Sequence, residues 1–168
     1  QGIMSYFNSA EEYLSVAVIK DGAEFVLFNE KEVAHMKDVK SLIWLDYYVL
    51  LGTGAYVLLY TGVSVFRGHS ERRRQLASAA VWSSGITLGL ILLLGIIAVT
   101  DFSTFFTAFH LISFSNDLWL LDPNTDYLLM MFPGGFWYDC VLYLATAIAI
   151  TALAIGGVSW WYLKKARS

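Results

Sequence analysis

The sequence predicts an all-α polytopic membrane protein: a helical bundle with three membrane spans, capped by a small extracytoplasmic segment. The first observation is composition, because 57% of the 168 residues are hydrophobic and 15% are charged, against about 45–50% and about 25% in soluble domains. The second is that the stretches 47–66, 76–99 and 140–160 contain no charged residue. At about 1.5 Å per residue, each can cross a hydrocarbon core of about 30 Å. These observations exclude a soluble enzyme, a nucleic-acid-binding protein and a disordered chain.

The third observation is the distribution of cations, which predicts the orientation of the spans. Lys and Arg close to a span stay on the cytoplasmic side, whereas Asp and Glu contribute little. Segment 67–75 holds four Arg and one Glu, and the residues after 163 add three cations. Segment 1–46 holds four Lys and eight acids, and 100–139 holds five Asp and no Lys or Arg. We therefore expect these two acidic segments on the extracytoplasmic side.

This orientation places residue 1 outside the cytoplasm, and the chain begins with Gln. We therefore expect a preceding transmembrane helix or signal sequence, with four helices in the full-length chain. The alternative is that a short N-terminal segment is translocated by itself. The predicted order is an extracytoplasmic cap with a hairpin and the His35 helix (1–42), a transmembrane helix (43–66), a basic cytoplasmic loop (67–75), a transmembrane helix (76–99), an aromatic interfacial segment with His110 (100–139), a transmembrane helix (140–163) and a cytoplasmic tail (164–168).

The first outer segment begins with the spacing of a capping box at Ser9 and Glu12, which predicts a helix start there. Residues rich in Val, Ile and Phe follow on both sides of Asp21 and Gly22. This pattern predicts a small β-hairpin with its turn at those two residues.

A second capping box, Asn29 with Glu32, opens the helix that leads toward the first span. His35, Asp38 and Leu42 share one face of this helix, because residues three and four apart are neighbours on a helix. Such a face can point a histidine at the bundle with a carboxylate beside it.

The second outer segment is unusually aromatic, which is typical of chain that lies at a membrane interface. We expect a short helix near 104–113, a turn at 122–124 and a second short helix that ends at Pro133. His110 lies within the first of these helices, between Phe106 and Phe114. An ionisable group in such apolar surroundings is costly and suggests a functional role.

His35 and His110 are therefore the candidate pair for a shared site, with Asp38, Asn116 and Asp117 as nearby polar groups. Imidazole has an ordinary pKa of about 6.5, so two of them suit proton transfer at both ends of a reaction. A mixed metal site and a purely structural role for the histidines are the alternatives. The metal site would use His35, Asp38, His110 and Asp117.

Other reactive residues give weaker signals. No serine lies in a Gly-x-Ser-x-Gly pattern. Cys140 is the single cysteine, which excludes an intramolecular disulfide and favours a packing role. His69 belongs to the basic cytoplasmic loop, where we expect it to face solvent or headgroups.

Two strings carry a family resemblance: FNEKEVAHMKDVK at 28–40 and FHLISFSNDLWLLDP at 109–123. The chain resembles the bacterial integral membrane family of the lipoprotein intramolecular transacylase, Lit, over almost its whole length. The resemblance implies transfer of the sn-2 acyl chain of a diacylglyceryl-modified lipoprotein to the α-amino group of that lipoprotein's own N-terminal cysteine. It also implies that members begin with one more membrane helix than is present here.

The resemblance further implies that His35 and His110 are the catalytic pair of the family's motifs. Asp38 would orient or stabilise His35, and Asn116, Asp117 and nearby backbone N–H groups are orienting or oxyanion candidates. No cofactor, metal or nucleic acid is expected. The partners would be a diacylglyceryl-modified bacterial lipoprotein and membrane lipid, at an extracytoplasmic site in the bacterial cell membrane. The alternatives are a non-enzymatic bundle that binds lipid or a partner helix, and a metal-dependent membrane hydrolase.

Overall fold

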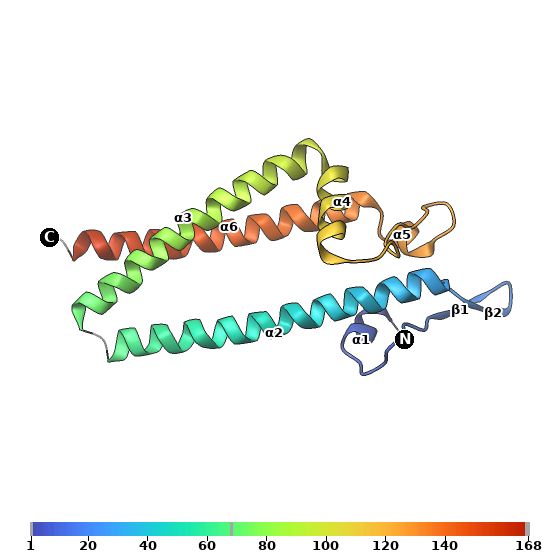
Figure 1. Cartoon of the computed structure of the whole chain (residues 1–168), viewed down its shortest axis with the longest axis horizontal. Coiled ribbons are helices and arrows are strands. Elements are labelled where there is room, and N and C mark those ends of the chain that lie inside the picture. Colours follow the sequence, from blue (N-terminus) through green and yellow to red (C-terminus); the bar gives the residue numbers. More distant parts are fainter. Residues whose placement is uncertain (1, 68, 167–168) are drawn as a thin grey trace. The chain divides into compact units, whose positions relative to one another are not determined.

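The computed structural model describes residues 2–67 and 69–166 and is largely helical (Figure 1). Gly68 of the predicted loop 67–75 and Arg167 of the predicted tail lie outside the described residues. A hairpin and six helices form this part of the chain. They are α1 (Ile3–Phe7), β1 (Ala17–Lys20), β2 (Ala23–Val26), α2 (Glu30–Phe66), α3 (Ser70–Thr100), α4 (Phe102–Ser113), α5 (Tyr127–Met131) and α6 (Gly134–Lys165).

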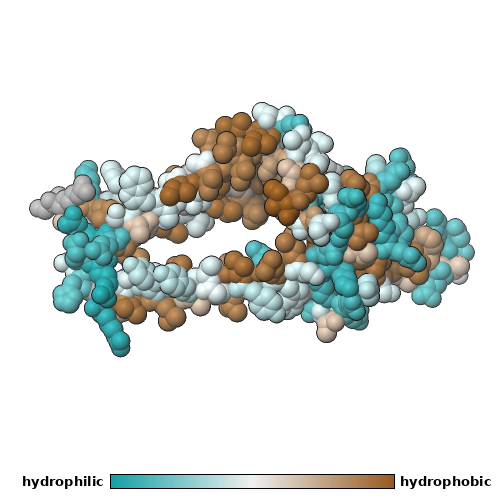
Figure 2. Space-filling view, in the orientation of Figure 1, coloured by the Kyte–Doolittle hydropathy of each residue, from teal (hydrophilic) through white to brown (hydrophobic). Residues whose placement is uncertain are grey.

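Helices α2, α3 and α6 are long and apolar enough to cross a membrane. Figure 2 shows hydrophobic side chains over α3 and hydrophilic ones around the hairpin and the start of α2. The predicted fold class, a helical membrane protein with three spans in this chain and a short hairpin, is confirmed. Helix α2 begins at Glu30, well before the charge-free stretch that starts at residue 47, so its first turns extend beyond that stretch.

The start of α2 is fixed by the second predicted capping box, which is confirmed. The Asn29 backbone N–H donates to Glu32 Oε2 at 2.8 Å, and the Glu32 backbone N–H donates to Asn29 Oδ1 at 2.9 Å. The other oxygen of this carboxylate, Oε1, accepts the backbone N–H of Leu128 at 2.6 Å. Glu32 is fully buried, and these backbone donors give both of its carboxyl oxygens a hydrogen-bond partner. The bond to Leu128 ties the start of α2 to α5.

The predicted helix start at Ser9 is wrong. The helix in this region, α1, lies before Ser9, and the Ser9 hydroxyl donates to the carbonyl of Tyr6 at 2.9 Å. The hydroxyl also accepts the Glu11 backbone N–H at 3.3 Å, as in a serine turn. Lys40 then holds the irregular chain by donating to the carbonyls of Ser9 at 2.8 Å and Glu11 at 2.7 Å. These hydrogen bonds to a distant residue hold the segment in an irregular conformation, although its local sequence is typical of a helix start.

The hairpin forms where the sequence predicts it. Strands β1 and β2 pair antiparallel, with Ala17 opposite Val26 and Lys20 opposite Ala23. Asp21 and Gly22 have φ values of 55° and 81°, the positive angles that a two-residue type I′ turn requires.

The chain forms two compact units, and the first contains the chain up to Leu50 together with Phe106–Trp137. Its core brings together side chains from α1, α2, α5 and the loops between them. Tyr6 is fully buried at its centre, and the Tyr6 hydroxyl donates to the carbonyl of Glu12 at 2.9 Å. The buried members are Tyr6, Leu14, Phe28, Met36 and Leu128.

The second unit contains Leu51–Phe105 and the described residues from Tyr138 onward. Helices α3 and α6 approach closely within it at Gly156. A Cβ atom at Gly156 would lie 2.9 Å from Ser84 Cβ and 3.2 Å from Ser84 Oγ. Small residues allow such contacts between helix backbones in lipid. By contrast, a Cβ at Gly85 or Gly89 would meet nothing within 4 Å.

We expect Gly156→Ala to lower the thermal stability of the protein in detergent, by about 1–3 kcal/mol, because the new methyl group overpacks against Ser84. Gly157→Ala is the matched control, since a Cβ at Gly157 meets nothing within 4 Å. Melting temperatures of the two variants would be compared from intrinsic tryptophan fluorescence, without a thiol-reactive dye. Equal melting temperatures for both would contradict the close approach at Gly156.

Candidate active site

The first unit contains an apolar cavity of about 310 Å³ with both candidate histidines in its wall. Side chains from α1, α2, α4, α5, the loop after α4 and the start of α6 line it. The lining residues are Phe7, His35, Val39, Leu42, Ile43, Phe106, Phe109, His110, Phe114, Trp119, Leu121, Leu128, Leu129, Phe132 and Trp137. Such a wall suits an aliphatic chain, and the two imidazoles are its titratable groups.

His35 on α2 and His110 on α4 both line this cavity, with ring centroids 6.1 Å apart. Both are buried, with 6% and 7% of their surface exposed. The Phe114 ring lies beside both, at 5.2 Å from His35 and 5.6 Å from His110. The structure therefore brings together two histidines that are 75 residues apart in the sequence.

A hydrogen bond assigns the tautomer of neutral His110. Its Nδ1 lies 2.8 Å from the carbonyl oxygen of Phe106, one turn earlier on α4. A carbonyl oxygen can only accept, so Nδ1 carries the proton and Nε2 carries the lone pair. The unprotonated nitrogen of His110 is thus available as a proton acceptor.

The surroundings keep both imidazoles neutral. Burial lowers the pKa of His35, and nearby His110 lowers it further, whereas the Asp38 carboxylate raises it. Burial also lowers the pKa of His110, against the effect of its bond to the Phe106 carbonyl. His35 precedes the first predicted span, and His110 lies in the segment between the second and third predicted spans. Neutral imidazoles can accept a proton at pH 7, as a general base must.

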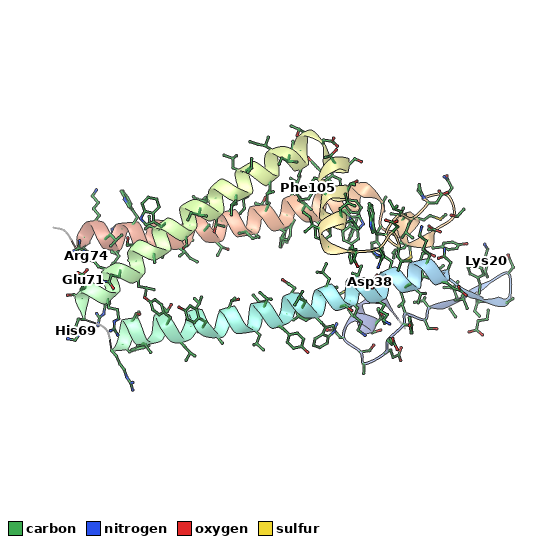
Figure 3. All side chains as sticks on the ribbon, viewed as in Figure 1. Lys20, Asp38, His69, Glu71, Arg74 and Phe105 are labelled. Atoms are coloured by element: carbon green, nitrogen blue, oxygen red, sulfur yellow. The ribbon has the colours of Figure 1, made fainter. Side chains whose placement is uncertain are left out.

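Asp38 and Asn116 contact each other beside the cavity rather than within its lining. Asn116 Nδ2 donates to Asp38 Oδ2 at 2.8 Å, and Asn116 Oδ1 accepts the backbone N–H of Leu118 at 3.0 Å. Figure 3 labels Asp38 on α2. Both residues line a neighbouring cleft of about 270 Å³, which shares Leu42 and Phe114 with the cavity. Asp117 is exposed and belongs to neither lining.

Two polar atoms in the cavity wall are buried without a hydrogen-bond partner among the described residues: His35 Nδ1 and Trp119 Nε1. Trp119 has no place among the candidates that sequence reasoning gives, although it belongs to the second quoted string. Its ring centroid lies 5.0 Å from that of His110. The sequence contains six Trp residues, and no local pattern marks the one whose N–H lacks an acceptor.

The side chains considered for a metal site do not assemble into one. Within residues 2–67 and 69–166, no three His, Cys, Asp or Glu side chains are grouped so that they could hold a metal ion. Asp38 is held by Asn116, and Asp117 is exposed, so neither joins the two imidazoles. The donor set at the cavity is therefore the histidine pair alone.

Comparison with known proteins shows the family of the chain. The family model described as Lipoprotein intramolecular transacylase Lit matches residues 1–137. An uncharacterized protein of Aquifex aeolicus (strain VF5) is 30% identical over 137 residues, which are 80% of this chain and 56% of that protein. The chain thus spans somewhat more than half the length of this relative.

A solved structure agrees in fold. The in meso structure of the membrane integral lipoprotein intramolecular transacylase Lit from Bacillus cereus matches with a TM-score of 0.72 and 21% identity. The match covers 98% of this chain and 71% of the other. Because the family model matches most of the sequence, this chain belongs to the Lit family of lipoprotein intramolecular transacylases.

Proposed function

We propose that this chain catalyses acyl transfer within a lipoprotein, from the sn-2 position of the diacylglyceryl group to the α-amine of the N-terminal cysteine that carries it. The observation that carries the proposal is the pair of buried imidazoles 6.1 Å apart in one apolar cavity. Family membership supports the same reaction class.

The reaction needs a proton acceptor for the amine and a proton donor for the departing oxygen. The amine nitrogen forms a bond with the acyl carbonyl carbon, and the bond from that carbon to the sn-2 oxygen breaks. The α-ammonium group, with a pKa of about 7.7–8.0, first loses one proton to give the neutral amine. The amine then loses a second proton as it becomes an amide nitrogen, and the glyceryl oxygen gains one. Atoms balance within a single substrate molecule, with no change in oxidation state.

We assign the base to His110, because its Nε2 carries the lone pair while Nδ1 donates to the Phe106 carbonyl. His35, whose ring centroid lies 6.1 Å from that of His110 in the same cavity wall, would then be the second imidazole that serves the substrate. Since amine and ester belong to one molecule, holding them together supplies an effective molarity of up to about 10⁵–10⁸ M. No enzyme nucleophile is then required.

The remaining polar candidates would act from the side of the cavity. Asp38 acts on His35 through its charge, which raises the pKa of that imidazole, and Asn116 orients Asp38. Asp117, which is exposed, stays a candidate for contact with the substrate's polar part. We place the site on the extracytoplasmic side of a bacterial membrane, where a lipoprotein and membrane lipid would be its partners.

Tandem mass spectrometry of a lipoprotein made with and without this protein tests the proposal. We expect the N-terminal cysteine to change from a diacylglyceryl group with a free amine to an N-acylated cysteine with a monoacylglyceryl group, at constant total mass. Release of free fatty acid would indicate a hydrolase instead. An unchanged terminus in both samples would refute the proposed function.

A further inference from the structure

The indole N–H of Trp119 is a buried donor without an acceptor among the described residues. Buried Trp N–H groups usually have a partner, and an unmade bond costs about 1–3 kcal/mol. Two other indoles of the first unit, Trp44 and Trp137, have hydrogen-bond partners although both side chains are exposed. Trp44 Nε1 donates to the Phe7 carbonyl and Trp137 Nε1 to the Phe132 carbonyl, each at 3.1 Å.

Trp119 also lies where the proposed chemistry takes place. Its side chain lines the cavity of about 310 Å³ together with both histidines. The ring centroids of Trp119 and His110 are 5.0 Å apart, and their planes are inclined by 34°. An acyl carbonyl attacked by an amine that gives its proton to His110 would therefore react beside this indole.

Acyl transfer passes through a negatively charged oxygen, which an unpaired hydrogen-bond donor can stabilise. When the amine attacks, the carbonyl oxygen takes up the π electrons and becomes negative in a tetrahedral intermediate. In an apolar cavity this charge is costly unless a donor faces it. Asn116, the oxyanion candidate from the sequence, donates to Asp38 and lines the neighbouring cleft. Trp119 is the neutral donor in the cavity wall that has no other partner among the described residues.

Resting on the proposed function, we propose that Trp119 is a further catalytic residue, which donates its indole N–H to the oxyanion of the migrating acyl group. The bond strengthens as the carbon–nitrogen bond forms and weakens as the carbon–oxygen bond breaks and the carbonyl returns. The proton from the amine passes to His110 and the glyceryl oxygen is protonated on leaving, so Trp119 releases no proton. The N–H is buried without a partner among the described residues, so the proposal requires that substrate binding bring the acyl carbonyl oxygen within hydrogen-bond distance of it.

Trp119→Phe tests this role, because it removes the N–H and keeps an aromatic ring. With a diacylglyceryl lipopeptide as substrate, we expect kcat to fall by about 10²-fold or more, with KM little changed. Replacing Trp119 with benzothienylalanine, which keeps the bicyclic shape without the N–H, should reproduce the loss. Trp82→Phe is the control, since it removes an indole N–H from an exposed tryptophan that does not line the cavity.

A second measurement separates catalysis from packing. A lipopeptide with a phosphonate in place of the sn-2 ester carries a negative tetrahedral centre, and an sn-2 amide analogue mimics the ground state. Trp119→Phe should weaken phosphonate binding by about the factor lost in kcat and leave amide binding unchanged. Equal weakening of both analogues, or full activity of the benzothienylalanine variant, would overturn the proposal.

The two proposals fail differently in these assays. If the unaltered protein turns over the lipopeptide and Trp119→Phe retains its kcat, the role of Trp119 fails while the proposed function stands. If the unaltered protein leaves the lipopeptide unchanged, the proposed function fails, and the role of Trp119 fails with it.

Discussion

Replacing His110 with Asn is expected to reduce the rate of acyl transfer by about 10²–10⁴-fold, the range typical of a lost general base. The Asn amide nitrogen takes the approximate place of Nδ1 and can still donate to the Phe106 carbonyl. The lone pair at the position of Nε2 is lost. The variant should therefore fold and bind substrate, but transfer no acyl chain at a useful rate. Mass spectrometry of the lipopeptide product and thermal stability would be measured on the same preparation.

His35→Asn should give a similar loss, because both imidazoles lie in the wall of the same cavity. His69→Asn is the matched control, since His69 immediately precedes α3 (Figure 3) and its side chain makes no cap hydrogen bond. Unfolding of both His35→Asn and His110→Asn would support a structural role for the pair. Full activity of either stable variant would contradict the assigned chemistry.

Replacing Glu32 with Ala is expected to have the largest effect on stability, about 2–4 kcal/mol, which combines a lost helix cap with an unpaired buried N–H. The carboxylate accepts the backbone N–H groups of Asn29 and Leu128 at 2.8 Å and 2.6 Å while fully buried. Leu128 also lines the histidine cavity, so we expect the variant to lose acyl-transfer activity below its melting temperature.

Glu30→Ala is the control for the Glu32 variant. Glu30 lies in the same first turn of α2 but is exposed, so its removal should cost at most about 1 kcal/mol from the helix dipole. Thermal unfolding in detergent would compare the two variants. Equal melting temperatures would show that the buried carboxylate does not hold α5 to the start of α2.

The local patterns in the sequence predict most of the helices and the hairpin. The asparagine–glutamate spacing at 29–32 predicts a cap, and Asp21 with Gly22 predicts a two-residue turn, because each signal acts over a few residues. The serine–glutamate spacing at 9–12 gives a wrong prediction. There the backbone carbonyls bond to Lys40, about thirty residues away, and periodicity carries no information about such a contact.

Local sequence patterns likewise do not predict the tertiary contacts of the candidate site. The sequence identifies His35 and His110 as titratable groups in apolar surroundings, which is a statement about composition. It does not predict that Glu32 reaches Leu128, or that Trp119 lacks an acceptor. Both facts depend on how segments nearly a hundred residues apart pack, and that arrangement is set by tertiary structure rather than by local pattern.

The continuity of α2 would set the height of the proposed reaction above the bilayer. From His35 to residue 43, where the proposed span begins, eight residues of unbroken helix rise about 12 Å. The ester bonds of a lipid lie lower, close to the boundary of a hydrocarbon core about 30 Å thick. A lipidated cysteine would thus have to move partly out of its leaflet. The phenylalanine and leucine side chains that line the cavity with the histidines would then replace the hydrocarbon surroundings of its acyl chains.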